Sequence, residues 1–416
     1  MKNQIIKLYK NPLIASSLIM IIGSNFANFL NYIYHLSVGR LLGPVGYGEL
    51  AGILSLSGLI TILPGSLNLV VTKFISSAKN EAELHSLIHW ITSFSFVLGG
   101  GLAIFVIIAS PFLSSFFKFN SSWLLIILAV SFFFSIPASY NRSILQGRLL
   151  FKGFVVTVVL ENFLRLALGV ALIYLGWSTY GAMAGIALAS FFGWFSTHYF
   201  LKIFSQKKSE KSQIDKKEIF FYTVPILIQS LATTSLYSSD VLVVKHFFDG
   251  HTAGIYASLS TLAKIIFFAT GPISAVMFPM VAKRKTDQKN FFSIFWWSLL
   301  LTTGVSLGVL FIYWIIPGII VNILYGSLYQ EAKQFLFPIS LSMGLFAISS
   351  LCISFALSIN KVKIVILPVL SAIIQITGMI FFHQNLLTII YVSLLTNVLL
   401  CLLTIGFILK LNYEKA

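Results

Sequence analysis

The sequence predicts an all-α integral membrane protein with twelve transmembrane helices in two six-helix lobes, related by a parallel repeat, around a central cavity. Of the 416 residues, 57% are hydrophobic and only 10% are charged. A soluble domain is typically about 25% charged, so this chain cannot cover a soluble surface of its size. Composition therefore excludes soluble enzymes, nucleic-acid-binding proteins and secreted disulfide domains. Its continuous apolar runs suit spanning helices, whereas barrel strands alternate apolar and polar residues.

Twelve apolar runs, each bounded by charged residues, Gly or Pro, are the predicted spans. In chain order they cover 13–38, 47–76, 88–110, 122–145, 153–176, 179–203, 219–244, 254–281, 291–317, 334–358, 363–382 and 386–410. The first run follows a basic start and is similar to a signal peptide. It continues to Val38 without a small-residue cleavage site, and we therefore interpret it as a span.

The basic residues indicate how these spans are oriented. The formal net charge is +16, and the predicted loops place 22 basic residues on one side of the membrane and four on the other. Those four are Arg40, Lys118, Lys245 and Lys333. Because basic loops stay in the cytoplasm, both termini are predicted to be cytoplasmic in a multi-pass plasma-membrane protein. The excess of basic residues then needs no nucleic-acid partner.

Two halves of the chain resemble each other. Residues 39–58 align with residues 245–264 without a gap, so that Gly48 matches Gly254 and Ser55 matches Thr261. Both copies begin on the non-cytoplasmic side, which indicates a parallel repeat. We expect an N-terminal lobe over 1–203, a cytoplasmic linker over 204–218 and a C-terminal lobe over 219–416. Such an architecture is typical of transporters, although a fold does not fix a function.

Two equivalent spans carry stripes of polar residues. At spacings of three and four residues the side chains of a helix share one face, and a polar face inside a membrane is costly unless it meets protein or water. The stripes are formed by Asn25, Asn28, Tyr32 and His35 in one span and by Gln229, Thr233, Tyr237 and Asp240 in the other. They suit a hydrophilic substrate such as a sugar chain, or alternatively they hydrogen-bond neighbouring helices.

Four charged residues lie deep in predicted spans. Glu161 and Arg165 are four residues apart and can pair on one helix face, and Asp240 and Lys264 can pair across a short connection. These pairs either brace the structure or have a function. In the functional interpretation, Arg165 and Lys264 bind a phosphate-bearing substrate, and Asp240 or Glu161 titrates or binds a coupling ion.

Further basic residues lie at the outer ends of two equivalent spans. Arg40 and Lys245 are candidates to receive an anionic head group there, or they are ordinary loop charges.

Cys352 and Cys401 lie inside apolar runs and are interpreted as packing residues. We expect no metal site and no cofactor. The sequence contains no HExxH motif, no phosphate-binding GxxxxGK[ST] loop and no large outer domain, which argues against an enzyme and excludes an ATPase within this chain.

Three stretches carry a family resemblance. GRLLGPVGYGELAGILSLSGLI at 39–60, SILQGRLLFKGFVVTVVLENFLRLALG at 143–169 and SDVLVVKHFFDGHTAGIYASLSTLAK at 239–264 resemble polysaccharide transporters of the multidrug/oligosaccharidyl-lipid/polysaccharide exporter superfamily. The resemblance implies a V-shaped bundle of two lobes and a flippase for undecaprenyl-pyrophosphate-linked oligosaccharide. Arg40, Asp240 and Lys264 match charged positions of the family pattern. Twelve spans favour the branch that serves O-antigen or capsule synthesis.

Together these observations favour a flippase, driven by an ion gradient or the membrane potential, that works by alternating access. Its partners would be polyprenyl-pyrophosphate-linked oligosaccharide and membrane lipid, it would act as a monomer, and its coupling ion would be a proton or sodium. A multidrug exporter of the same fold predicts an acidic cavity without net positive charge. A membrane glycan polymerase or ligase predicts an outer pocket with catalytic carboxylates or His.

Overall fold

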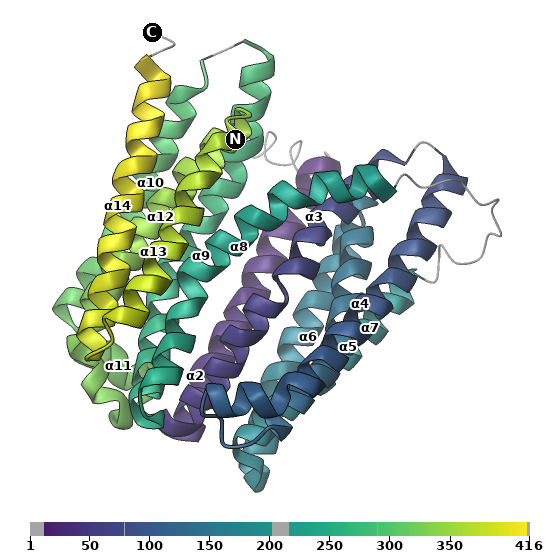
Figure 1. Ribbon diagram of the computed structural model, residues 1–416. Helices are drawn as coiled ribbons and strands as arrows, with labels where there is room; N and C mark the ends of the chain where they lie inside the picture. The colour runs from purple at the N-terminus through teal and green to yellow at the C-terminus, as the bar shows by residue number, and fades with distance from the viewer. Residues whose placement is uncertain (1–11, 79, 202–215, 289, 414–416) are drawn as a thin grey trace, which may run out of the picture. The chain divides into compact units, whose positions relative to one another are not determined.

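The computed structural model describes residues 12–78, 80–201, 216–288 and 290–413. Regular structure within these ranges is entirely helical, as Figure 1 shows. The linker expected at 204–218 lies mostly outside the described residues. The all-α membrane fold expected from the sequence is confirmed.

The helices follow the predicted spans in order. The first half contains α2 (Pro12–Ile60), α3 (Ile62–Ser77), α4 (Glu81–Phe116), α5 (Trp123–Gly147), α6 (Phe151–Leu172), η1 (Ile173–Trp177) and α7 (Ser178–Leu201). The second half contains α8 (Lys216–Phe247), α9 (Gly250–Thr286), α10 (Phe292–Ile315), α11 (Pro317–Tyr325), η3 (Ser327–Gln334), α12 (Leu336–Ser358), η4 (Val362–Val365), α13 (Ile366–Phe381) and α14 (Leu386–Tyr413).

Several of these helices are long and apolar enough to cross a membrane. Among the described residues eight stretches meet this condition, or nine if the bent pair Ile22–Ile60 and Ile62–Ser77 is one span. One of the eight, Phe151–Leu201, contains two predicted spans joined by η1, and α2 contains one span and the start of the next. The chain is therefore a multi-pass membrane protein.

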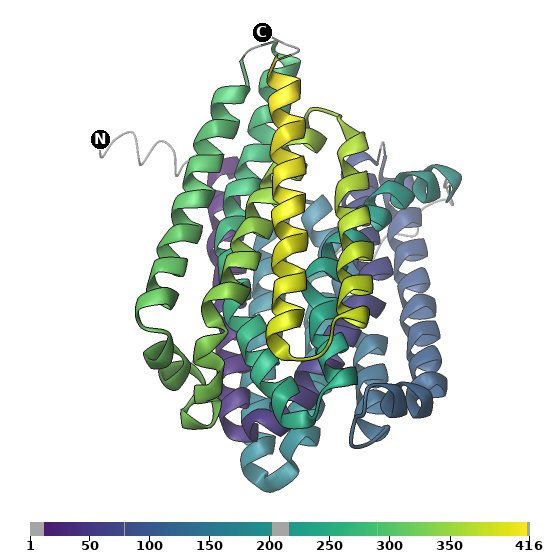
Figure 2. The same cartoon turned by 60° about the vertical axis from the view of Figure 1, so that its left-hand side comes forward.

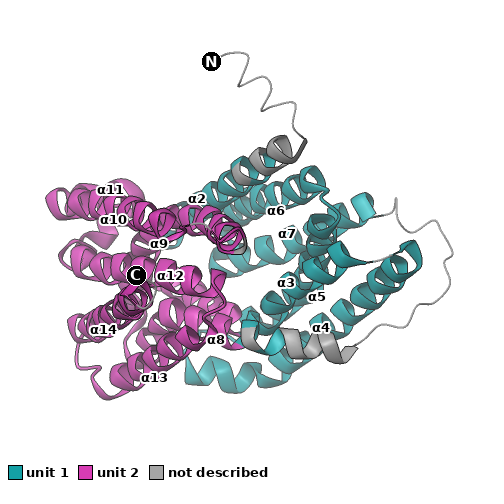
Figure 3. Cartoon of the chain, turned by 90° about the horizontal axis from the view of Figure 1, so that it is seen from above, with its two compact units in different colours: residues 1–42, 60–227 teal, residues 43–59, 228–416 magenta. Residues whose placement is uncertain are grey.

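The described chain divides into two compact units, which Figure 3 colours separately. Unit 1 comprises residues 1–42 and 60–227, and unit 2 comprises residues 43–59 and 228–416.

Within unit 1, α5 packs against α3, α4 and α7, and α6 packs against α7. A Cβ atom on Gly185 would lie 2.5 Å from the Cα atom of Gly169. These two glycines let α6 and α7 approach each other closely, as small residues do in membrane helices.

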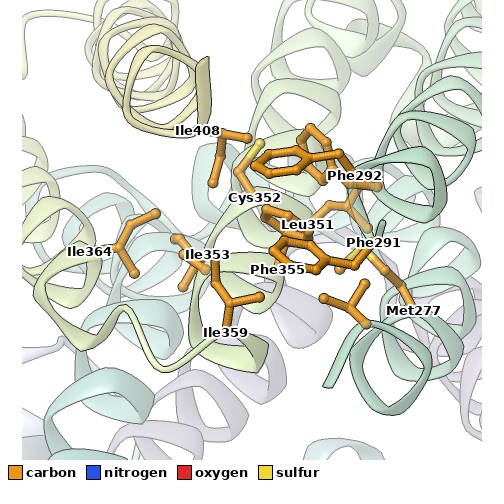
Figure 4. Packing of buried hydrophobic residues seen from close by; sticks show 13 residues of the cluster. Met277, Phe291, Phe292, Leu351, Cys352, Ile353, Phe355, Ile359, Ile364 and Ile408 are labelled. Atoms are coloured by element: carbon orange, nitrogen blue, oxygen red, sulfur yellow. The ribbon is translucent and has the colours of Figure 1, made fainter. Parts of the chain in front are cut away.

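Unit 2 is organised around α12, which packs against α9, α10 and α14. Figure 2 shows α14, in yellow, next to α13. A buried apolar cluster joins the end of α9, the start of α10 and the end of α12 (Figure 4). Phe295 and Phe355 in this cluster are at most 1% exposed. Cys352 belongs to this cluster, and both it and Cys401 are free buried thiols. Both cysteines therefore occupy packing positions, as the sequence indicated.

Residues 43–59 belong to α2 but pack within unit 2. The helix is interrupted at Gly43, whose φ of 66° is a left-handed conformation that favours glycine. Beyond this break the Tyr47 hydroxyl lies 2.9 Å from the Thr261 hydroxyl and 3.2 Å from the Tyr325 hydroxyl. A Cβ atom on Gly48 would lie 2.6 Å from the Gly254 nitrogen, so the two glycines that the repeat equates are in direct contact.

The connection between α8 and α9 is fixed by a helix cap. The Asp249 carboxylate accepts hydrogen bonds from the backbone nitrogen and the hydroxyl of Thr252, at 3.0 and 2.6 Å. Asp249 is a preferred residue for this position. The Thr252 hydrogen bonds hold the pKa of this carboxyl below its ordinary value.

Candidate functional site

Unit 1 contains a buried cluster of three charged side chains from α5 and α6. Arg142 Nη2 lies 2.5 Å from Glu161 Oε2, and Arg165 Nη2 lies 3.6 Å from Glu161 Oε1. One carboxylate thus lies between two guanidinium groups, which gives the cluster a net charge of +1. Arg165 is the fifteenth residue of α6, roughly 20 Å along the helix at its usual rise per residue, so the cluster lies within the apolar part of the chain.

Neighbouring polar groups hold the two arginines in different ways. Arg142 donates from Nη2 to the Thr157 carbonyl oxygen at 3.1 Å and from Nε to the Thr157 hydroxyl at 3.3 Å. Arg165 donates from Nη1 to Asn31 Oδ1 at 3.0 Å, but its buried Nε has no hydrogen-bond partner among the described residues. The Arg165 side chain is 24% exposed, compared with 13% for Arg142. Arg165 is therefore the more exposed of the two arginines, and it retains a buried donor without a partner.

A glycine on α7 makes room for the carboxylate. A Cβ atom on Gly193 would lie 2.5 Å from Glu161 Oε2 and 3.2 Å from Arg142 Nη2. No larger residue fits at this position while the ion pair keeps its geometry. The packing of α7 against α5 and α6 is thus part of the charge cluster.

Arg142 is one of the 22 basic residues counted with the loops, although the predicted span 122–145 contains it, and its assignment to a loop is wrong. The helix continues to Gly147, and Arg142 lies within it. The segment remains helical because its polar side chains have partners within unit 1. Asn141 donates to the Thr197 hydroxyl at 2.9 Å, and the Ser143 hydroxyl donates to Asn68 Oδ1 at 3.1 Å. The expected Glu161–Arg165 pair is present, but Arg142 is the closer partner of Glu161. Arg142 was missed as a partner because it was counted with the loop residues.

Unit 2 contains a second buried polar cluster around Asp240, which is 5% exposed. The Tyr256 hydroxyl donates to Asp240 Oδ2 at 3.0 Å, and the Ser260 hydroxyl lies 3.5 Å from the same oxygen. Both donors come from α9, one helical turn apart, and they face the end of α8. The other carboxylate oxygen, Asp240 Oδ1, is buried without a hydrogen-bond partner in the described chain.

The expected pairing of Asp240 with Lys264 is absent. No ion pair within 4.0 Å joins these two described residues, and the Lys264 Nζ atom instead lies 5.8 Å from the centre of the Tyr237 ring. Lys264 is one helical turn beyond Ser260 on α9, and the ring of Tyr237 provides a cation–π contact. A basic and an acidic group therefore lie near each other without neutralising each other by direct contact.

Unit 2 contains further buried oxygen atoms without hydrogen-bond partners among its described residues. Gln375 donates from Nε2 to the Leu236 carbonyl oxygen at 3.0 Å, one helical turn before Asp240, while its Oε1 atom has no partner in the described residues. Ser393 and Asn397 on α14 also carry buried side-chain oxygens of this kind. Buried polar atoms are normally hydrogen-bonded. These oxygen atoms therefore suit a bound water molecule or a small hard cation.

The remaining predicted site residues lie in different environments. Lys245 lies in the last turn of α8, at the end of its span as expected, and is only 6% exposed. Arg40 is exposed. In the two polar stripes Asn25 and Asn28 are exposed, and the others are half-buried: Tyr32, His35, Gln229, Thr233 and Tyr237.

Glu49, which the sequence analysis did not select, is 3% exposed within residues 43–59. In the described part of the chain no group of three or more His, Cys, Asp or Glu side chains could hold a metal ion.

The fold is shared with solved membrane transporters. An inward-facing multidrug resistance MATE family transporter of the MOP superfamily matches with a TM-score of 0.78 and 15% identity, over 95% of this chain and 100% of that chain. The lipid II flippase MurJ in an inward closed conformation matches with a TM-score of 0.74 and 16% identity, over 94% of this chain and 87% of that chain. The MATE/MurJ-like architecture implied by the sequence resemblance is therefore confirmed.

Sequence comparisons extend this result. An uncharacterized membrane protein of Methanocaldococcus jannaschii is 24% identical over 288 residues, which cover 65% of this chain and 68% of the relative. The family model described as "Polysaccharide biosynthesis protein" matches residues 13–285, which include both charge clusters up to Lys264. Since this match covers more than half of the sequence, the chain belongs to the polysaccharide biosynthesis protein family of membrane proteins.

Proposed function

We propose that the protein is a flippase that moves a polyprenyl-pyrophosphate-linked oligosaccharide from the inner to the outer leaflet of the plasma membrane. Membership of the polysaccharide biosynthesis family supports a sugar substrate, and the likeness to the named lipid II flippase supports a lipid-linked one. The observation that carries the proposal is the net positive cluster of Arg142, Glu161 and Arg165 within the membrane-spanning part of unit 1.

The arginines would bind the pyrophosphate group. An uncompensated cation inside a membrane is costly, and an anionic ligand would remove that cost. Arg165 is the residue assigned to this role because its Nε has no partner and its side chain is accessible. A guanidinium group binds phosphate oxygens through two parallel hydrogen bonds. Arg142 is already held by Glu161 and Thr157, and its role is to position that carboxylate.

The Asp240 cluster would couple transport to an ion. Its free carboxylate oxygen and the neighbouring unpartnered oxygens offer the ligand type that a hard cation prefers, and a carboxylate can equally accept a proton. Either event changes the charge at the junction of α8 and α9. Sodium or a proton would therefore drive the cycle, and the sugar chain would pass along the polar faces of α2 and α8.

The basic residues would orient the protein in the membrane. The strong excess on one side would place both termini in the cytoplasm, so that the charged head group would enter from the side on which it is synthesised. The polyprenyl chain would stay in the lipid while the head group crosses.

Translocation in proteoliposomes tests the proposal. Purified protein is reconstituted with a fluorescent undecaprenyl-pyrophosphate oligosaccharide, and the fraction that an added enzyme can reach in the outer leaflet is followed with time. Arg165→Gln should slow translocation at least about tenfold, because the loss of a bidentate charged contact costs more than one hydrogen bond. Arg148→Gln, which removes a partly exposed arginine at the end of α5, should leave the rate within about twofold.

Two results would contradict the proposal. Normal translocation by the Arg165→Gln protein would remove the anion-binding role of the cluster. Absence of translocation by the wild-type protein, together with gradient-driven export of a cationic dye from the same vesicles, would favour a multidrug exporter instead. Ion coupling is tested separately by applying a proton or sodium gradient to vesicles that contain the wild-type or the Asp240→Asn protein. The gradient should raise the translocation rate of the wild-type protein and leave that of the Asp240→Asn protein unchanged.

A further inference from the structure

An open pocket of about 560 Å³ lies where α9 ends and α10 begins, within unit 2 and away from the Asp240 cluster. Its lining residues are Met280, Lys283, Arg284, Asp287, Asn290 and Ile294. Lys283 and Arg284 lie in the last turn of α9, where basic residues interact favourably with the helix dipole. The dipole does not explain why these polar residues face the apolar side chains of Met280 and Ile294 across one pocket.

The polar wall presents hydrogen-bond donors in fixed positions. Arg284 Nη1 donates to the Asn290 carbonyl oxygen at 3.0 Å and to the Ser293 hydroxyl at 3.3 Å, which anchors the guanidinium group and leaves its other N–H groups available. Asn290 Oδ1 accepts from the Phe292 nitrogen at 3.0 Å, so its amide nitrogen remains free to donate. The Lys283 side chain is exposed, and its ammonium group forms no hydrogen bond or ion pair with the described residues.

The third basic residue of the run has a different task. Lys285 donates to the Ile359 carbonyl oxygen at 2.6 Å and thereby ties the end of α9 to the turn after α12. Only Lys283 and Arg284 therefore contribute positive charge to the pocket, and Asp287 contributes one negative charge. The lining has a net charge of +1, which matches one phosphodiester group.

The apolar wall continues along exposed apolar side chains of α9 and α10. Met280 is 47% exposed, and Val276, one turn earlier on α9, is 50% exposed. On α10 the lining residue Ile294 shares a helix face with Trp297, which is 67% exposed, and Leu301. Exposed apolar side chains of a spanning helix contact acyl chains, and Trp is enriched where those chains meet the head groups.

We propose that this pocket binds the head group of an anionic membrane phospholipid. Lys283, Arg284 and Asn290 would hold the phosphodiester oxygens, and the acyl chains would lie along Met280, Ile294 and Trp297. Asp287 would accept a hydrogen bond from a hydroxyl-bearing head group such as glycerol and would disfavour a more highly charged free anion. Basic pockets between helices on the cytoplasmic side are typical of this kind of lipid recognition. The inference depends on the chain's orientation in the membrane but not on the transported substrate.

Lipid retention by the full-length protein tests the inference. Protein in nanodiscs that contain equal parts of phosphatidylglycerol and phosphatidylcholine with identical chains is transferred to detergent and analysed by native mass spectrometry. The wild-type protein should retain phosphatidylglycerol preferentially. The Lys283→Gln/Arg284→Gln protein should bind phosphatidylglycerol at least about tenfold more weakly, because each basic residue near an anionic lipid surface contributes about 1 kcal/mol to the binding free energy.

A matched control removes the same charge elsewhere. Lys361 and Lys363 are exposed, lie in the next basic loop of unit 2 and do not line the pocket. Their double Gln variant should retain phosphatidylglycerol within about twofold of wild type. Lys283→Gln alone should also weaken retention. Because the Lys283 ammonium group has no partner among the described residues, this variant separates binding from folding.

The inference would be overturned by any of three results. These are unchanged retention in the pocket variant, equal losses in the pocket and control variants, and equal retention of the two lipids by the wild-type protein. Complete displacement of phosphatidylglycerol by millimolar inorganic phosphate would indicate a soluble anion site instead. Translocation rates measured on the same proteins report separately on the proposed flippase activity.

Discussion

Single residues decide whether the buried charges of unit 1 can form their cluster. Glu161 can lie between two arginines only because the facing position on α7 has no side chain. Breaking a buried ion pair by disturbing one partner costs about 3–5 kcal/mol, since the remaining charges cannot regain water. Gly193, which neither bends the chain nor caps a helix, is therefore required for the cluster as much as the charged residues are.

At Gly193 this reasoning gives a specific expectation. Gly193→Val should displace Glu161 from Arg142, with the new Cβ atom starting 2.5 Å from Glu161 Oε2, and should lower the midpoint of thermal unfolding in detergent by several degrees. Gly101→Ala is the control, because a Cβ atom there meets nothing within 4 Å. That variant should be neutral or slightly stabilising, as Ala is a better helix former than Gly by about 1 kcal/mol. Equal stability of the two variants would show that the cluster does not depend on Gly193.

At the scale of the elements, the unusual feature is the division of α2 between the two units. Residues 43–59 follow a left-handed glycine and are held in unit 2 by the Tyr47 hydrogen bonds and by backbone contact with α9. Such close contact is typical of small residues at membrane helix interfaces. The segment follows residues of unit 1 along the chain, but its side chains pack within unit 2.

Enlarging Gly254 should separate this segment from α9. Its Cβ atom would overlap the Pro44 carbonyl oxygen, and backbone cannot move aside as a flexible side chain can. We expect Gly254→Ala to cost about 1–3 kcal/mol as an overpacked contact, measured as a lower denaturation midpoint of the purified protein. Gly271→Ala, on the same helix with nothing within 4 Å, should have no such effect. Wild-type stability in Gly254→Ala would show that residues 43–59 are not tightly packed there.

At the scale of the whole molecule, the distribution of basic residues predicts the orientation. The two native cysteines are 0% and 5% exposed and provide an almost unreactive background for cysteine labelling. In intact cells a membrane-impermeant maleimide should label a His251→Cys protein, at the start of α9, and should not label a Gln288→Cys protein, after α9. Both positions are exposed. The opposite pattern would invert the topology and with it the proposed direction of transport.

The fold was more predictable than the site, for a physical reason. Spanning helices must be about twenty residues long and apolar, and this local requirement is visible in the composition of each segment. The spacing of Glu161 and Arg165 within one helix was visible in the same way. The partner Arg142 was not, because a basic residue near the end of a span is usually counted with the loop. Only its contacts with α6 and α7 make its burial tolerable.

The sequence by itself determined an all-helical membrane protein, the order of its helices and the repeat that equates Gly48 with Gly254, since each depends on residue type along the chain. Only the tertiary structure decided that Arg142 completes the cluster, that Asp240 bonds Tyr256 rather than Lys264, and that residues 43–59 pack in unit 2. These choices depend on which groups find partners across helices once water is excluded, and no pattern within a single helix encodes that.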